Sequence, residues 1–246
     1  MEVTAIIQAR VSSSRLPNKI FAQISGKPLV WHVVDRLKHS KRITRIAVAT
    51  TTNPADNVLE KWCRENKIEV FRGSEEDVLS RYFHAAKSMG AETIVRITSD
   101  DPFKDPEIID KVVDLFVKNK LDFAYNNNPP SFPEGLDVEV FSMEALERAQ
   151  AESRDPYERE HVTQYFYRHP EKFRQMNLAN KEDRSSLRWT IDTKEDLEMA
   201  RAVYAELYKG GKIFLMGDIL RLIRERPEIP SMNSGVKRSA MYEKKK

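Results

Sequence analysis

Basic and hydroxyl side chains cluster just after the first apolar run of the chain. Residues 3–9 are almost continuously apolar, as expected of a strand buried on both faces of a parallel sheet. The next residues include three serines and the cations Arg10, Arg15 and Lys19. Guanidinium, ammonium, hydroxyl and backbone N–H groups together suit a polyphosphate. The glycines of a Walker loop or a dinucleotide fingerprint are missing, and a solvated basic loop is the alternative interpretation.

Aspartates follow two other apolar segments. Asp100 and Asp101 come after the predicted strand 93–98, and Asp192 follows the predicted strand 187–191. Open α/β sheets bind ligands at the carboxyl ends of their strands, so we expect the carboxylates of Asp100 and Asp101 near the basic loop. Carboxylate oxygens suit hard cations such as Mg²⁺, which commonly bridges protein and substrate phosphates. The alternative is that these aspartates cap turns or helix N-termini.

The segments that must position these side chains alternate between strand and helix. Short apolar runs typical of strands are followed by segments with helical spacing. We therefore expect an α/β fold with a doubly wound, mainly parallel sheet. The pattern predicts strands at 3–9, 45–50, 69–71, 93–98 and 122–125, with intervening helices at 28–37, 55–66, 75–89 and 106–119.

The pattern changes from Asn126 onwards, where turn-forming residues gather. We interpret residues 126–180 as an excursion with no obvious place in the sheet, inserted into a single domain that spans 1–230. Residues 231–246 are expected to form a basic, flexible tail. This half of the chain is predicted to contain strands at 136–141, 174–180 and 187–191, and helices at 142–152, 159–168, 195–208 and 216–225.

Composition excludes several classes of protein. Among 246 residues the formal net charge is +3, but residues 234–246 carry five basic residues and one acidic residue, which leaves the rest of the chain at −1. A nucleic-acid partner is therefore not expected. No apolar run approaches the roughly 20 residues that a membrane span needs. The single cysteine, Cys63, allows no intramolecular disulfide, and without a signal peptide we expect a cytoplasmic location.

Several ordered blocks resemble the sugar-acid cytidylyltransferases, the enzymes that make CMP-Kdo and CMP-sialic acids. Residues 9–19, followed by Gly-Lys-Pro-Leu at 26–29, are similar to the nucleotide-binding signature of that family. The branch that the chain resembles most is the spore-coat polysaccharide biosynthesis cytidylyltransferases, although Ser-Asp-Asp at 99–101 replaces the usual Gly-Asp-Cys and leaves a metal role for Asp101 open. Further similar blocks lie at 73–82, 95–102, 135–141, 159–163 and 187–197.

The resemblance implies a nucleotide-diphospho-sugar transferase fold, which is GT-A-like, and a set of catalytic residues. It implies that Arg10, Arg15 and Lys19 bind the triphosphate and stabilise the leaving group. It also implies that Asp100 and Asp192 bind Mg²⁺. Together, the expected catalytic residues are Arg10, Arg15, Lys19 and Asp100.

The resemblance also points to positions around the base and the acceptor sugar. The nucleotide-binding residues that it adds are Gln8, Ala9, Arg72 and Arg81, and the acceptor-binding candidates are Asp137, Glu139 and His161. Arg72 has an alternative as a surface charge at a strand end. Asp137 and Glu139 share one face of a strand, which points either inward or to solvent. A structural role is the alternative for His161.

The expected activity is nucleotidyl transfer, in which a sugar-acid hydroxyl attacks the α-phosphorus of CTP and pyrophosphate leaves. Positioning and charge neutralisation dominate such chemistry, so a covalent enzyme intermediate is not expected. One alternative is a nucleotide-sugar-dependent glycosyltransferase of GT-A type, and a second is a catalytically silent nucleotide-binding protein. A homodimer is expected from the resemblance and from the excursion at 126–180. The identity of the sugar acid stays open.

Overall fold

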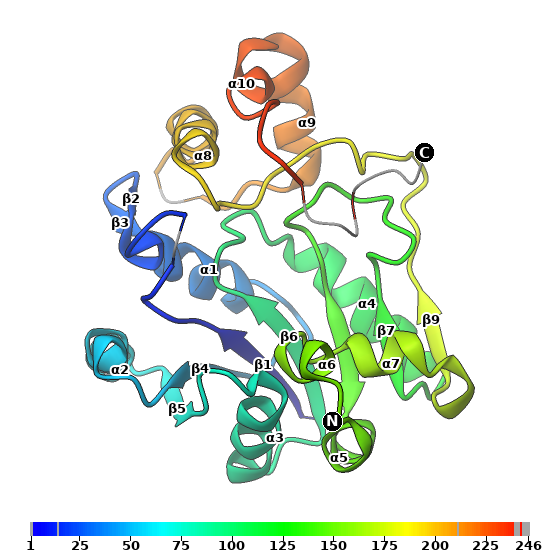
Figure 1. Ribbon diagram of the computed structural model, residues 1–246. Coiled ribbons are helices and arrows are strands. Elements are labelled where there is room, and N and C mark those ends of the chain that lie inside the picture. The colour runs from blue at the N-terminus through cyan, green and yellow to red at the C-terminus, as the bar shows by residue number, and fades with distance from the viewer. Residues whose placement is uncertain (1, 14, 211, 239–241, 243–246) are drawn as a thin grey trace.

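A central mixed sheet organises the computed structural model, which describes residues 2–13, 15–210, 212–238 and 242 (Figure 1). Within these residues, seven strands form one sheet in the order β5-β4-β1-β6-β8-β7-β9. Neighbouring strands are parallel, except that β8 runs antiparallel to both β6 and β7. The expected mainly parallel α/β sheet is confirmed. Its strands are β1 (Val3–Gln8), β4 (Arg45–Thr51), β5 (Glu69–Gly73), β6 (Thr93–Thr98), β7 (Phe123–Tyr125), β8 (Glu139–Ser142) and β9 (Gln175–Asn177).

Helices cover both faces of this sheet. In β1, Ala5 and Ile7 join one core cluster, whereas Ile6 joins the other, and all three side chains are fully buried. Covering on both faces explains why the first strand is apolar along its whole length. The first cluster includes residues of α1 (Leu29–Lys38), α2 (Asn57–Glu65) and α4 (Pro106–Lys118), and the second includes residues of α3 (Val78–Met89), α5 (Met143–Glu152) and α7 (Gln164–Arg168).

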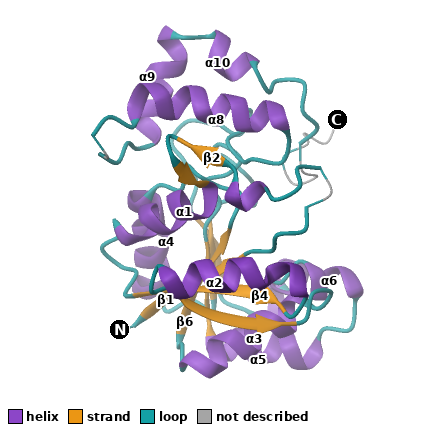
Figure 2. Ribbon diagram, turned by 90° about the vertical axis from the view of Figure 1, so that its left-hand side faces the viewer, coloured by secondary structure: helices purple, strands orange, loops and turns teal. Residues whose placement is uncertain are grey.

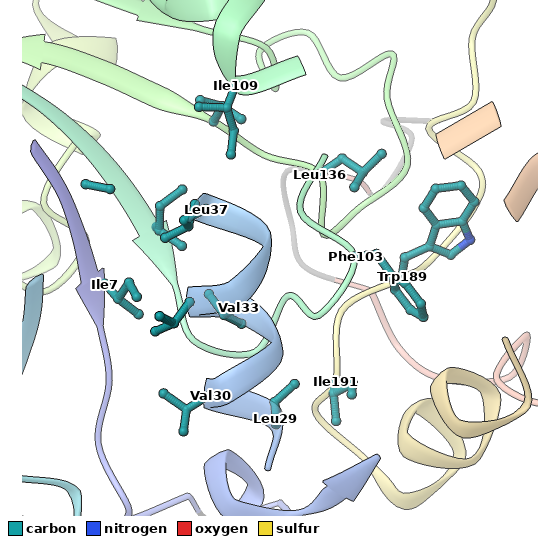
Figure 3. Close-up of a cluster of buried hydrophobic side chains, with 14 of the residues drawn as sticks. Ile7, Leu29, Val30, Val33, Leu37, Phe103, Ile109, Leu136, Trp189 and Ile191 are labelled. Carbon is teal, nitrogen blue, oxygen red and sulfur yellow. The ribbon is translucent and has the colours of Figure 1, made fainter. Parts of the chain in front are cut away.

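The C-terminal helices extend the first cluster beyond the sheet. Figure 2 shows α8 (Lys194–Leu207), α9 (Met216–Glu225) and α10 (Glu228–Ser231) grouped above the short strands β2 (Gln23–Ile24) and β3 (Lys27–Pro28). In Figure 3, Phe103 and Trp189 lie next to each other on the side of α1 away from Ile7. Their ring centroids are 6.1 Å apart. The remaining short helices are α6 (Pro156–Glu160), η1 (Lys19–Phe21), η2 (Pro54–Asp56) and η3 (Pro170–Lys172).

The interpretation of residues 126–180 as a segment outside the sheet is wrong. This segment supplies β8, which fills the position between β6 and β7, and β9, which extends the sheet beyond β7. Both strands are short, and their pairing satisfies backbone groups that would otherwise remain open at the edge of the sheet.

Two predicted elements also differ from the structure. The single helix predicted at 159–168 is two helices, α6 and α7, because the backbone at Val162 is left-handed (φ 40°) and turns its side chain into the core. Residues 187–191 are not a strand of the sheet, and in the part of the chain that the structure describes they form one isolated bridge, from Arg188 to Glu134. Their side chains nevertheless alternate as in a strand, with Trp189 and Ile191 buried in the core.

The described part of the C-terminal tail packs against the domain. Asn233 is 4% exposed and donates a hydrogen bond to Asp196, and Arg238 forms an ion pair with Glu134 at 3.0 Å. Tail residues 239–241 and 243–246 lie outside the described residues. Across the described chain, no helix combines the length and the apolar character that a bilayer crossing requires.

Gly135 is expected to be essential for the packing of residues 134–136 against residues 188–190. Its φ is +105°, and an added Cβ would lie 2.8 Å from both the Thr190 nitrogen and the Trp189 carbonyl carbon. We predict that Gly135→Ala lowers the free energy of unfolding by about 2 kcal/mol or more, measured by urea denaturation. Gly217→Ala in α9 is the control, because a Cβ there meets nothing within 4 Å. Equal stability of the two variants would contradict the prediction.

Candidate functional site

Two adjoining cavities lie at the carboxyl ends of β1 and β6. The first, here called the basic-loop cavity, has a volume of about 680 Å³. The second, here called the acidic cavity, has a volume of about 500 Å³. Thr98, Asp100, His161 and Asp192 line both. The carboxyl edge of the sheet therefore has room for two ligands that meet at these four residues.

The predicted phosphate-binding cations line the basic-loop cavity. Its walls include Arg10, Arg15 and Lys19, together with Gln8 and Ala9 at the end of β1. The backbone N–H of Val11, two residues after Ala9, donates to the buried Asp56 carboxylate at 2.7 Å and fixes the start of the loop. The loop is thereby anchored at its base while its cations face the cavity.

Lys19 joins the two predicted metal ligands. Its Nζ donates to Asp100 Oδ2 and Asp192 Oδ1, both at 2.8 Å, and to the Ile191 carbonyl at 3.0 Å. Burial alone would lower the pKa of Lys19, but the two carboxylates raise it well above its usual value. Burial likewise opposes ionisation of Asp100, yet Lys19 holds the pKa of that carboxyl below its usual value. Lys19 and Asp100 are therefore charged at neutral pH.

Arg188 orients Asp192. Its Nη2 lies 3.0 Å from Asp192 Oδ2, while its other nitrogens contact Asp196 at 2.9 Å and Glu134 at 3.0 Å. Asp196 also accepts hydrogen bonds from the backbone N–H groups of Asp192 and Thr193 at the start of α8. The sequence block 187–197 contains Arg188, Asp192 and Asp196 but not Glu134, and its spacing alone shows only the helix cap.

Arg10 and Arg15 are less constrained than Lys19. The Arg15 guanidinium lies 3.0 Å from Asp192, and the Arg10 guanidinium lies 3.6 Å from Glu75. Both arginine side chains are more than half exposed. Such surface ion pairs are weak, so both guanidinium groups can turn towards a bound anion at little cost.

Asp100 and Asp192 fit a magnesium ion only if other oxygens complete its shell. Their carboxylates converge on one ammonium group, which provides a pair of hard oxygen donors at one point. In the described residues, no group of three or more His, Cys, Asp or Glu side chains is placed to hold a metal. Phosphate and water oxygens would therefore supply the remaining ligands. Asp101 is turned away to Lys104, at 2.8 Å, and does not join the pair.

The two arginines predicted near the base differ in position. Arg81 is buried, lines the basic-loop cavity and donates to the Ser74 carbonyl, while its Nε has no partner. Arg72 does not line the cavity, which corrects the prediction. Its guanidinium bonds the Thr51 carbonyl at 2.8 Å and Glu60 at 2.7 Å, because its side chain leaves β5 towards α2.

All three acceptor-binding candidates line the acidic cavity. Asp137 accepts a hydrogen bond from the Tyr242 hydroxyl, and His161 packs edge-on against Tyr157 with ring centroids 4.4 Å apart. The side chains of Asp137 and Glu139 thus lie on the cavity side of this segment and not on its solvent side. Burial lowers the pKa of His161, so its imidazole is neutral at neutral pH.

Glu139 is fully engaged with protein groups. Its carboxylate contacts Arg96 at 2.5 Å, Thr163 Oγ1 at 2.9 Å and the Tyr167 hydroxyl at 2.8 Å. Although burial opposes ionisation, these donors hold the pKa of Glu139 below its usual value. Sequence reasoning missed Arg96 and Tyr242, which line the cavity, and Tyr167, which binds Glu139. The contacts of all three residues are distant in sequence.

Arg188 is predicted to be a major stabilising residue of the site. Replacing it by methionine removes the guanidinium from Asp196, which is fully buried. We expect Arg188→Met to lower the free energy of unfolding by about 3 kcal/mol or more, because an uncompensated charge remains in the interior. Arg201→Met on α8 is the matched control, since Arg201 is exposed and pairs with Glu198 at the surface. Denaturant unfolding that gives equal losses for both variants would refute this role.

Comparison with known proteins agrees with the geometry. The cytidylyltransferase family model matches residues 4–219. The chain is 35% identical to the spore coat polysaccharide biosynthesis protein SpsF of Bacillus subtilis, covering 82% of this chain and 86% of that protein. It is 32% identical to 3-deoxy-manno-octulosonate cytidylyltransferase of Geobacter sulfurreducens over 119 residues, covering 48% of this chain and 47% of that protein.

Solved structures show the same architecture. A cytidylyltransferase from Leptospira borgpetersenii superposes with a TM-score of 0.90 at 35% identity, covering 97% of this chain and 100% of that chain. A CMP:2-keto-3-deoxy-manno-octonic acid synthetase in complex with CTP superposes with a TM-score of 0.65 at 17% identity, covering 84% of this chain and 99% of that chain. The expected nucleotide-diphospho-sugar transferase fold is confirmed. The chain is a nucleotidyltransferase and belongs to the cytidylyltransferase family.

Proposed function

We propose that the protein transfers CMP from CTP to a nonulosonic or octulosonic acid. One observation carries the proposal: a cation-lined cavity and a second polar cavity meet at Asp100 and Asp192. A nucleotide and an acceptor held in these cavities would face each other at that junction. The resemblance to an octulosonate cytidylyltransferase and to a spore coat polysaccharide biosynthesis protein supports a sugar acid destined for a cell-surface or spore-coat polysaccharide.

In the proposed reaction the basic-loop cavity holds CTP. Arg10, Arg15 and Lys19 bind the triphosphate, and their charges stabilise pyrophosphate as it leaves. Gln8, Ala9 and Arg81 also line this cavity, and we assign them to the nucleoside. The acceptor hydroxyl oxygen forms a bond to the α-phosphorus and loses its proton to water, and the bond from that phosphorus to the bridging oxygen of pyrophosphate breaks.

Asp100 and Asp192 are the residues that would hold Mg²⁺. When bound, the ion would supply charge neutralisation at the phosphates and a lower pKa for the acceptor hydroxyl. Lys19, which contacts both carboxylates in the structure, is then available to the phosphate oxygens. Arg188 keeps Asp192 oriented throughout, because it is anchored by Asp196.

The acidic cavity is assigned to the sugar acid. Asp137 and His161 can contact its hydroxyl groups, while Glu139 positions the guanidinium of Arg96 beside the cavity. Arg96 is the cation in this wall that can meet the acceptor carboxylate. A supply of CTP in the cytoplasm fits this activity, and we propose that the enzyme works there.

The metal assignment predicts a severe effect of Asp192→Asn. The substitution keeps the shape of the side chain but removes its charge, so we expect kcat/KM to fall by about 100-fold or more. Turnover is followed as pyrophosphate release from CTP, with a panel of nonulosonic and octulosonic acids and titrated Mg²⁺. Asp114→Asn on the exposed face of α4 is the matched control and should retain wild-type rates. Wild-type magnesium-dependent turnover by Asp192→Asn would show the assignment to be wrong.

We also propose a homodimer formed through the β9 edge of the sheet. β9 is a terminal strand, and Met176 on it is 42% exposed. We predict that Met176→Glu shifts the sedimentation coefficient from dimer to monomer, because it places charge in an apolar contact. Val58→Glu changes a similarly exposed side chain on α2 and should leave the dimer intact. A wild-type protein that sediments as a monomer at working concentration would exclude this proposal.

A further inference from the structure

The C-terminal segment reaches back into the acidic cavity. Tyr242 is only 6% exposed, lines this cavity and donates its hydroxyl hydrogen to Asp137 Oδ1. Four residues earlier, Arg238 forms an ion pair with Glu134 at 3.0 Å and donates to the Leu187 carbonyl at 3.1 Å. The Arg238 guanidinium also lies over the Tyr242 ring, 5.1 Å from its centroid. Tyr242 is thus held in the cavity wall by its hydrogen bond to Asp137 and by the Arg238 guanidinium, which is itself anchored at Glu134 and Leu187.

Asp137 differs from the other carboxylates of the acidic cavity. Each of the others has a cationic side chain within ion-pair distance: Asp100 and Asp192 have Lys19, Asp101 has Lys104, Glu134 has Arg188 and Glu139 has Arg96. Among the described residues, the hydrogen-bond donors to the Asp137 carboxylate are the Tyr242 hydroxyl and the Gly135 N–H, at 3.4 Å for the latter. Within the described part of the chain, the Asp137 carboxylate thus has no ion-pair partner, since the nearby Lys104 ammonium bonds the Asp137 backbone carbonyl instead. The carboxylate remains able to accept hydrogen bonds from a ligand.

We propose that Tyr242 and Asp137 together contact hydroxyl groups of the acceptor, so that the C-terminal segment helps to set acceptor preference. The carboxylate accepts hydrogen bonds from the acceptor, and the tyrosine hydroxyl both orients that carboxylate and offers an oxygen to the acceptor. The inference rests on the proposed function, which assigns the acidic cavity to the sugar acid. The family model ends at residue 219, so the family match does not cover Tyr242.

The test compares Tyr242→Phe and Asp137→Asn with a matched control. Tyr208→Phe removes a hydroxyl at the end of α8, away from both cavities. Steady-state pyrophosphate release gives separate KM values for CTP and for the best sugar-acid acceptor. We expect each cavity variant to raise the acceptor KM by about tenfold or more, as for loss of a hydrogen bond to a charged group, while the KM for CTP stays unchanged. Tyr208→Phe should change neither value.

The outcomes separate this inference from the proposed function. Absence of pyrophosphate release by the wild-type protein with every acceptor would overturn the proposed function and this inference with it. Wild-type turnover together with an unchanged acceptor KM in Tyr242→Phe and Asp137→Asn would overturn this inference alone. Equal increases in both KM values, accompanied by a lower melting temperature, would show a structural role and would also overturn it. A selective rise in acceptor KM at an unchanged melting temperature supports it.

Discussion

The Lys19 ammonium between Asp100 and Asp192 is the interaction on which the site depends. It joins the loop after β1, the end of β6 and the segment before α8, which are far apart in sequence. Each carboxylate would be costly at this partly buried position without the cation. The same three groups provide a positive charge for phosphate and a pair of oxygens for a hard metal ion. One electrostatic arrangement therefore stabilises the free protein and, in the proposed function, prepares it for a metal nucleotide.

A buried ion-pair network centred on Arg188 holds the Asp192 carboxylate in place beside Lys19. Arg188 contacts Asp192, Asp196 and Glu134 at once, and Asp196 also closes the N-terminus of α8. Trp189, which follows Arg188 in the sequence, lies in the hydrophobic core and fixes the backbone beside this network. Buried ion pairs contribute little net stability when they are intact, but the loss of one partner is costly. The network therefore fixes the geometry of the site more than it adds to the stability of the fold.

The sequence identified the parts of the site that follow from strand order and local pattern. Parallel strands end at one edge, so the basic loop and Asp100 could be placed together before the structure was known. The errors arise from non-local contacts. Residues 187–191 have the alternation of a strand, but among the described residues they have one bridging partner, Glu134. Arg72 follows the direction of its own strand towards α2, and Tyr242 returns from the end of a chain segment that has no periodic pattern.

In the proposed function, CTP occupies the basic-loop cavity with its α-phosphorus at the junction of the two cavities. A crystal structure of the protein with CTP and Mg²⁺ would test this most directly. We expect phosphate oxygens at Arg10, Arg15 and Lys19, and Mg²⁺ held by the carboxylates of Asp100 and Asp192. A triphosphate bound in the acidic cavity, or an α-phosphorus remote from both aspartates, would contradict it.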